Sequence, residues 1–276
     1  KVETTTKPDG TKIQTETKKD GTKGETTNAK DGSTTKTETK KDGSSVTESK
    51  DAAGSIGTVK TDRHGQTTAE TTLSSKAIED AKKSGEAVKA PVEVKATRNS
   101  DTAPTVKIEL PRNSGETKVE IPVSNVKPGT VAVLVHPDGT EEIIKNFVPT
   151  EDGIQLTVNG GATVKIVDNS KDFIDTREHW SRDQVNFVAA RELFQGVGDN
   201  QFGVGRPMTR GMVNTVLARL AGVDTTPAAG QNWYDKGIRV SELRYITVEA
   251  ALAGRATITL NCDSPVTRQK VTRHYK

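Results

Sequence analysis

The chain has 276 residues, of which 31% are hydrophobic and 4% aromatic, and its 40 Lys and Arg nearly balance 37 Asp and Glu for a net charge of +3. Because proteins that bind duplex DNA usually concentrate basic residues on one face, this balance does not indicate that class, and we expect no nucleic-acid partner. The one cysteine, Cys262, excludes an internal disulfide and a cysteine metal cluster, and no apolar run reaches the ~18 residues of a membrane span.

An eleven-residue repeat occupies the N-terminal part, which contains no aromatic residue before Phe147. Glycines recur without a slip at positions 10, 21, 32, 43, 54 and 65, and the first four of them follow an Asp. Thr alternates with charged residues between the glycines, a pattern that favours extended strands, and Asp-Gly is typical of type I′ hairpin turns. Residues 1–74 lack the large aliphatic residues of a core, so two predictions remain open: a thin β-ribbon or a disordered polar stalk. Either would serve as a spacer.

The next segment, residues 75–170, changes character. Ser75 to Ser84 predicts a short helix that begins after a serine cap and ends at Gly85. Alternating or continuous apolar runs then predict short strands at 91–96, 105–110, 118–123, 130–135, 141–145, 154–158 and 162–167. This spacing indicates a small all-β module, sandwich-like or barrel-like, and we expect it to be structural.

Aromatic residues gather in the next segment, residues 171–224. Apolar residues at helical spacing predict helices over residues 181–193 and 209–220, and Thr209 is a suitable N-cap for the second. A glycine-rich loop, residues 195–207, separates the two.

This segment resembles the S-layer homology (SLH) domain. The family's opening F-x-D and H-W are matched by residues 173–175 and by His179-Trp180, and its A-x-x-G/L-h-x-G-x-G stretch by residues 189–198. A loop phenylalanine, Phe202, and the closing hydrophobic-T-R stretch at residues 208–212 complete the match. The chain departs from the usual pattern at Gly211 and Met212, where many members have Ala-Glu, so an acidic group at this place is in doubt.

Residues 225–276 resemble a degenerate or truncated second repeat, from Trp233-Tyr234 to residues 266–269. Its interior, residues 239–261, lacks the expected helix, glycine loop and aromatic residue. We hypothesise a shifted reading frame or a truncated gene there, which the nucleotide sequence would test. The predicted fold is thus multidomain: repeats, a central small all-β module and C-terminal α-helical SLH repeats.

The resemblance implies a function as well as a fold. SLH repeats pack as a pseudo-threefold bundle whose grooves bind secondary cell-wall polysaccharide, often through an acidic pyruvylated sugar. It therefore implies a secreted protein of the Gram-positive cell wall or S-layer, anchored non-covalently. Whether protomers oligomerise to complete a three-repeat bundle is left open by the sequence. The carbohydrate-binding residues implied by the motif are Trp180, Gly196, Gly198, Thr209, Arg210, Trp233 and Arg268.

These residue types suit the chemistry, although each has a structural alternative. Arg210 at a helix start would offer a fork of donors to a carboxylate, or it is a solvated surface residue. Trp180 would lie against a sugar ring, or it is a core residue. Gly196 and Gly198 would let backbone N–H groups approach the ligand, or they only supply turn geometry.

No catalytic pattern stands beside these residues. The four histidines form no H-E-x-x-H motif, residues 168–179 fail the calcium-loop pattern, and Gly196-Val197-Gly198 lacks the strand that a dinucleotide site requires. We therefore expect no enzyme activity, no cofactor and no metal. Two alternatives to the wall anchor remain: a structural or adhesive stalk without glycan binding, and a C-terminal fragment of an SLH-anchored hydrolase.

Overall fold

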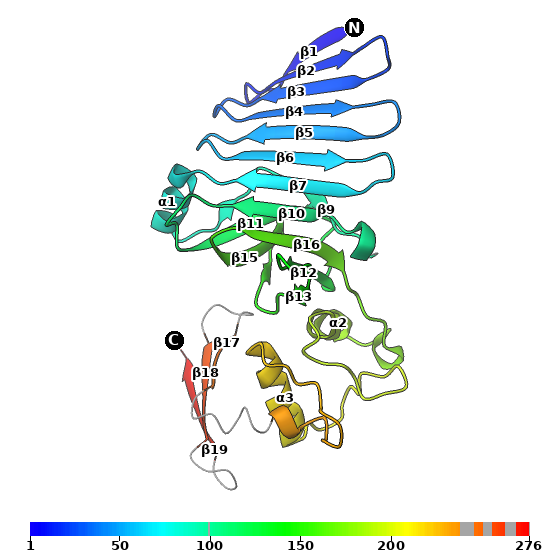
Figure 1. The fold of residues 1–276 in the computed structure, drawn as a ribbon, viewed down its shortest axis with the longest axis vertical. Coiled ribbons are helices and arrows are strands. Elements are labelled where there is room, and N and C mark those ends of the chain that lie inside the picture. Colours follow the sequence, from blue (N-terminus) through cyan, green and yellow to red (C-terminus); the bar gives the residue numbers. More distant parts are fainter. Residues whose placement is uncertain (99, 238–245, 251–255, 263–268, 276) are drawn as a thin grey trace. The chain divides into compact units, whose positions relative to one another are not determined.

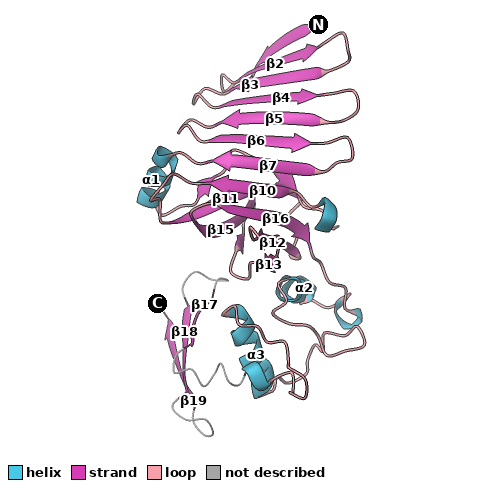
Figure 2. Ribbon diagram, viewed as in Figure 1, coloured by secondary structure: helices cyan, strands magenta, loops and turns pink. Residues whose placement is uncertain are grey.

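The computed structural model describes residues 1–98, 100–237, 246–250, 256–262 and 269–275, and strands dominate it (Figures 1 and 2). The chain divides into two compact units, Lys1–Asn169 and Ser170–Lys276. Among the described residues, no helix combines the length and apolarity needed to cross a bilayer.

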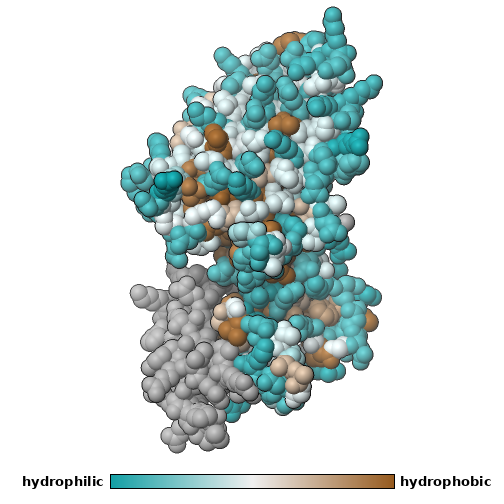
Figure 3. Space-filling view, in the orientation of Figure 1, coloured by the Kyte–Doolittle hydropathy of each residue, from teal (hydrophilic) through white to brown (hydrophobic). Residues whose placement is uncertain are grey.

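Seven strands of the first unit form an antiparallel meander that follows the eleven-residue period (Figure 1). Each strand pairs with the next one in the chain, and from β2 onward each has six residues. The strands are β1 (Val2–Thr6), β2 (Lys12–Thr17), β3 (Lys23–Asn28), β4 (Thr34–Thr39), β5 (Ser45–Lys50), β6 (Ile56–Thr61) and β7 (Thr67–Thr72). Hydrophilic and intermediate side chains cover most of the surface of this part (Figure 3).

The turns between these strands differ from the predicted type I′. In the first, Gly10 donates its N–H to the Lys7 carbonyl at 2.9 Å, and Lys7 donates to the Thr11 carbonyl at 2.8 Å. Gly10 has φ +88°, whereas Asp9 is not among the residues with positive φ. This is the pattern of a three-residue hairpin loop with glycine in the left-handed position. The Asp9 carboxylate accepts the Thr11 N–H at 2.8 Å, which explains why aspartate precedes the glycine.

The meander continues into a larger sheet, because β7 pairs in parallel with β10 (Thr105–Glu109). β10 then pairs with β16 (Ala162–Asp168), followed by β12 (Thr130–Val135) and β13 (Glu141–Ile143), which gives an eleven-stranded sheet. In chain order, the helix α1 (Ser75–Ser84) follows β7 and precedes β8, the first strand of the second sheet. Ser74 is its N-cap, and Gly85, with φ +75°, ends it.

A second sheet packs against the end of the first that contains β10, β16 and β12, and its edge reaches as far as Gly57 of β6. Its order is β14-β15-β11-β8, with β9 also paired to β11. The strands are β8 (Val88–Lys89), β9 (Val94–Lys95), β11 (Glu116–Ser124), β14 (Val148–Pro149) and β15 (Gly153–Asn159). The core lies between the sheets, where Ile108, Ile121, Ile154 and Ile166 are fully buried. Burial of such side chains contributes about 1.5–3 kcal/mol each, so the stability of this unit is concentrated here.

The predicted fold class is wrong for the repeats. Residues 1–74 are neither a thin ribbon nor disordered, and the central module is not a separate small domain, since one eleven-stranded sheet runs through both. The decisive contact is the parallel pairing of β7 with β10, in which Ala69 lies opposite Val106. It attaches the meander to a sandwich with a core, and a periodic pattern gives no sign of such a long-range pairing.

The fold class is also wrong for the C-terminal unit, where the helical part is small. α2 (Arg182–Ala190) and α3 (Arg210–Leu220) occur where helices were predicted, with a 3₁₀ turn at Ile174–Thr176 before them. A three-stranded antiparallel sheet, β17 (Ile246–Ala250), β18 (Ala256–Cys262) and β19 (Gln269–Tyr275), replaces the expected second helical repeat. These stretches alternate Thr, Val and Ile with other residues, and β-branched residues favour strands over helices.

Candidate functional site

The carboxylate of Asp175, in the middle of the 3₁₀ turn Ile174–Thr176, holds several backbone groups of the second unit. It accepts the backbone N–H groups of Phe202 at 2.8 Å, Gly203 at 2.8 Å and Val204 at 3.1 Å. These bonds, that of Phe202 first, lower the pKa of Asp175 from its usual value of 3.8, because they stabilise the ionised form. Asp175 therefore holds the glycine-rich loop in place.

Aromatic rings pack against Phe202 of the same loop. Phe202 contacts Phe173 edge-on at 5.5 Å between ring centroids, and Phe194 at 5.8 Å. Gly196, at φ +81°, lies where a Cβ would be 2.5 Å from the Gln201 carbonyl oxygen. A side chain at this position would push the loop apart, so Gly196 has a packing role.

The second helix is capped as its sequence predicts. Thr209 accepts the Met212 N–H through its hydroxyl at 3.3 Å, and the Met212 sulfur accepts the Thr209 N–H at 3.4 Å. Met212 thus takes the reciprocal place that Glu occupies in a capping box. Gly211 makes room for Tyr234, whose Cβ lies 3.0 Å from the position a Cβ would take.

A cavity of about 690 Å³ opens between the loop and the helices of this unit. Trp180, 83% exposed, and Trp233, 49% exposed, both line it, together with Met208 and Val197. Two tryptophans with free faces on one cavity are suited to stacking on apolar ring surfaces. The exposure of Trp180 shows that it is not a core residue.

Two arginines line this cavity, and neither was predicted. Arg206 is exposed, whereas Arg219 is fixed by bonds to the Leu193 carbonyl at 3.0 Å, to Gln195 Oε1 at 3.1 Å and to the Thr225 hydroxyl at 3.0 Å. Burial lowers the pKa of the Arg219 guanidinium from its usual value. Arg219 organises the wall of the cavity, which leaves Arg206 as its accessible cation.

The structure brings together only some of the residues predicted for the site. Trp180, Gly196 and Trp233 line the cavity, whereas Gly198, Thr209 and Arg210 are not among its lining residues. Arg210 is exposed at the first position of α3. Arg268 lies outside the described residues. Arg206 carries no sequence signal of its own, because only the folding of the loop places it beside the tryptophans.

One buried polar group also borders the cavity. Thr215 on α3 is 1% exposed, and its hydroxyl has no hydrogen-bond partner among the residues that the structure describes. Over those same ranges, no three His, Cys, Asp or Glu side chains gather as a metal-ligand set would.

Comparison with known families finds one match within this unit. Residues 172–211 match the S-layer homology domain, so the protein contains an SLH domain. The match includes Trp180, Asp175 and the whole glycine-rich loop, and it ends at the first turn of α3. Neither the curated proteins nor the solved structures that were searched contain a match to this chain.

Proposed function

We propose that this chain anchors a surface protein non-covalently to the bacterial cell wall by binding secondary cell-wall polysaccharide through its SLH domain. The observation that carries the proposal is the family match over residues 172–211, since an SLH domain indicates association with the cell surface in general. The cavity beside Trp180 supports the finer statement, because it combines exposed aromatic faces with a cation.

In this proposal Trp180 and Trp233 contact the apolar faces of sugar rings, and an arginine binds an acidic substituent such as a pyruvyl group. Arg206 takes the role first predicted for Arg210, because Arg206 lines the cavity. An arginine offers a carboxylate two parallel hydrogen bonds, which favours acidic over neutral glycans. The chain acts as a binding protein of the secreted, wall-associated fraction, without catalysis.

The meander of the first unit acts as a spacer. Neighbouring strands lie about 4.8 Å apart, so the six steps from β1 to β7 extend the sheet by about 29 Å. If the cavity binds no glycan, this spacer role alone remains, as a structural stalk.

Sedimentation with purified cell walls tests the anchor. The full chain is expected to co-sediment with intact walls and to remain soluble with walls stripped of secondary polysaccharide. Trp180→Ala and Arg206→Ala should each weaken binding about tenfold or more, since each removes a direct contact. Matched controls are Val213→Ala, an exposed apolar residue away from the cavity, and Arg210→Ala.

Three results would contradict the proposal: no wall binding, equal binding to stripped walls, or a loss with Arg210→Ala that Arg206→Ala does not produce. Sedimentation equilibrium of the free chain tests whether several protomers assemble to complete a three-repeat bundle. A chain that is monomeric in solution and still binds cell walls would exclude the assembly of protomers as a requirement for binding.

A further inference from the structure

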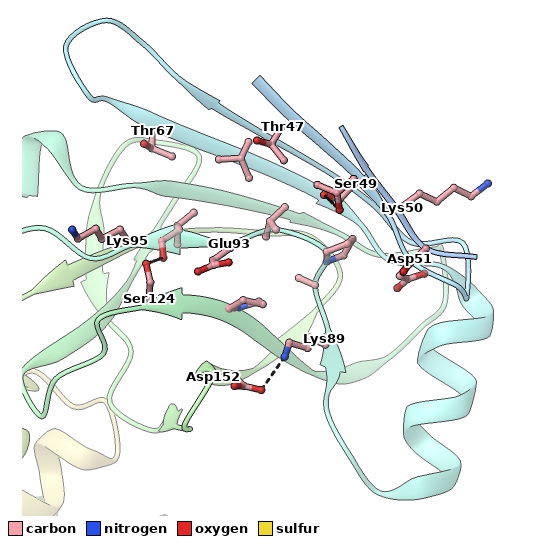
Figure 4. Close-up of a pocket in the computed structure, with 18 of the residues that line it drawn as sticks. Thr47, Ser49, Lys50, Asp51, Thr67, Lys89, Glu93, Lys95, Ser124 and Asp152 are labelled. Atoms are coloured by element: carbon pink, nitrogen blue, oxygen red, sulfur yellow. Dashed lines mark hydrogen bonds and ion pairs between the residues drawn. The ribbon is translucent and has the colours of Figure 1, made fainter. Parts of the chain in front are cut away.

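A second and larger hollow lies in the first unit, and its lining contains no residue of the SLH domain. It has a volume of about 840 Å³ and is bordered on one side by β4 to β7 of the large sheet. Its other wall is the edge strip, residues 88–95, which contains β8 and β9 and forms the edge of the second sheet. Figure 4 shows Thr47, Ser49 and Thr67 on the sheet side and Glu93 and Lys95 on the strip.

The sheet wall of this groove is the uncovered continuation of the core face. Residues that pair across neighbouring strands share a face, and the ladder Ser49–Gly57–Thr71–Ile108 runs from the groove to the fully buried Ile108. On this one face of the sheet, the aliphatic side chain of Ile108 on β10 thus gives way to hydroxyl side chains on β7 and β5.

Charged and hydroxyl residues are sorted between the two faces of β4 to β7. The outer face carries every charged residue of these strands, namely Lys36, Glu38, Glu48, Lys50, Lys60 and Glu70. The groove face carries none; its residues are Thr35, Thr37, Thr39, Ser45, Thr47, Ser49, Gly57, Val59, Thr61, Thr67, Ala69 and Thr71.

This face without charged residues includes the groove and is interrupted at the neighbouring strand β3, which lies outside the groove lining and carries Lys23 and Glu25 on the same face. The strand after it, β2, again has no charged residue on that face. Solvated strand faces usually carry charged residues, as the outer face does here. The groove face instead bears hydroxyls that are held in place by contacts across strands, with 3.0 Å between the Thr61 and Thr67 oxygens and 3.0 Å between those of Thr37 and Thr47.

The charged residues that line the groove are balanced in sign. Lys89 of the strip pairs with Asp152 at 2.9 Å, Glu93 and Lys95 of the strip are of opposite sign, and so are Lys50 and Asp51 at the end of β5. Gly57 of β6 touches the strip: a Cβ there would lie 2.2 Å from the Pro91 carbonyl oxygen. The sheet and the strip are therefore in close contact at Gly57.

We propose that this groove binds an uncharged, polyhydroxylated chain, that is, a neutral oligosaccharide segment. Rows of fixed hydroxyls can donate to and accept from sugar hydroxyls, and Val59 and Val92 offer apolar contact for sugar C–H groups. An added peptide strand fits the strip poorly, because β8 and β9 have two residues each and Pro91 lacks an N–H donor.

Saturation-transfer NMR and calorimetry with the full chain test the proposal. The probes are cello-, malto-, manno- and chito-hexasaccharides, with an oligogalacturonate of equal length as the charged comparator. At least one neutral probe is expected to bind, and more tightly than the oligogalacturonate. The double variant Thr47→Val and Thr61→Val, which keeps side-chain shape and removes two hydroxyls, should weaken that binding about tenfold or more.

The matched control is Thr26→Val with Thr58→Val, the same change on the outer face, which should leave binding within about twofold of the unchanged chain. Ser49→Ala provides a milder groove variant if the double variant lowers the melting temperature. Trp180→Ala should leave neutral-probe binding unchanged, so the outcome is independent of the SLH site. Failure of all four neutral probes to bind, or equal losses from groove and outer-face variants, would overturn the proposal.

Discussion

The two ends of the eleven-stranded sheet belong to one ladder of backbone hydrogen bonds, but they differ in how much apolar side-chain burial stabilises them. At the sandwich end, Ile108 is fully buried between two sheets. Along the same cross-strand row, Ser49 and Thr35 line the open groove instead of a closed core, and Ile13, further along, is only half-buried. A regular ladder with good turns can therefore extend from a packed core without a core of its own, and stability should differ sharply along one sheet.

The largest expected effect compares two isoleucines on this row. Ile108→Ala should lower the free energy of unfolding by about 2–5 kcal/mol, because it leaves a cavity in a closed core. Ile13→Ala, at a half-buried position of β2, should cost less than about 1 kcal/mol. Urea unfolding followed by circular dichroism measures both. Similar losses of unfolding free energy for the two variants would show that Ile13 also lies in a packed core, contrary to our expectation.

A smaller effect is expected where the two regions meet. Gly57→Ala places a methyl group against the Pro91 carbonyl and should cost about 1–3 kcal/mol through displacement of the edge strip. Gly24→Ala is the matched control, since its nearest neighbour is Glu16 Cβ at 3.9 Å and its φ is not positive. Thermal unfolding should show a lower midpoint for Gly57→Ala alone. An unchanged midpoint would mean that the strip does not press on the sheet.

The smallest effect concerns the turns at the open end. The bonds from the Thr22 and Ser44 N–H and hydroxyl groups lower the pKa values of Asp20 and Asp42 below 3.8, and Asp9 and Asp31 behave alike. Since the folded pKa is the lower one, these carboxylates stabilise the fold above pH 3.8, and this contribution is lost as the pH falls through the folded pKa values.

Melting temperatures at pH 6, 4 and 2.5 measure that loss. A variant with Asn at all four positions should keep the turn bonds but show a weaker decline on acidification than the unchanged chain. Parallel pH curves for the two proteins would contradict the assignment of the lowered pKa values to the turns. The four sites are exposed, so the difference should be the smallest of the three.

Much of the local structure could be predicted from single residues. The eleven-residue period gives the strand positions, Thr209 the start of α3, and Ser74 and Gly85 the limits of α1. The turn type was predicted wrongly, because Asp-Gly suits two hairpin geometries and only backbone angles distinguish them.

The candidate sites were less predictable. The motif identifies Trp180, but the cation that lines the same cavity is Arg206. The loop that carries Arg206 is held by Asp175, which lies 27 residues before its hydrogen-bond partner Phe202. The neutral groove has no motif at all. Its hydroxyls belong to ordinary threonine repeats, and it becomes recognisable only when the register shows which face each residue occupies.

For this protein, the amino-acid sequence by itself determined the period of the strands, the helix limits and the SLH resemblance, because these depend on residues close together in the chain. The tertiary structure alone decided that the repeats join a sandwich, which face of β4 to β7 has no charged residue, and which arginine borders the tryptophans. Those features arise from pairings between distant segments, above all β7 with β10, whose free energy depends on a core that no local pattern reveals.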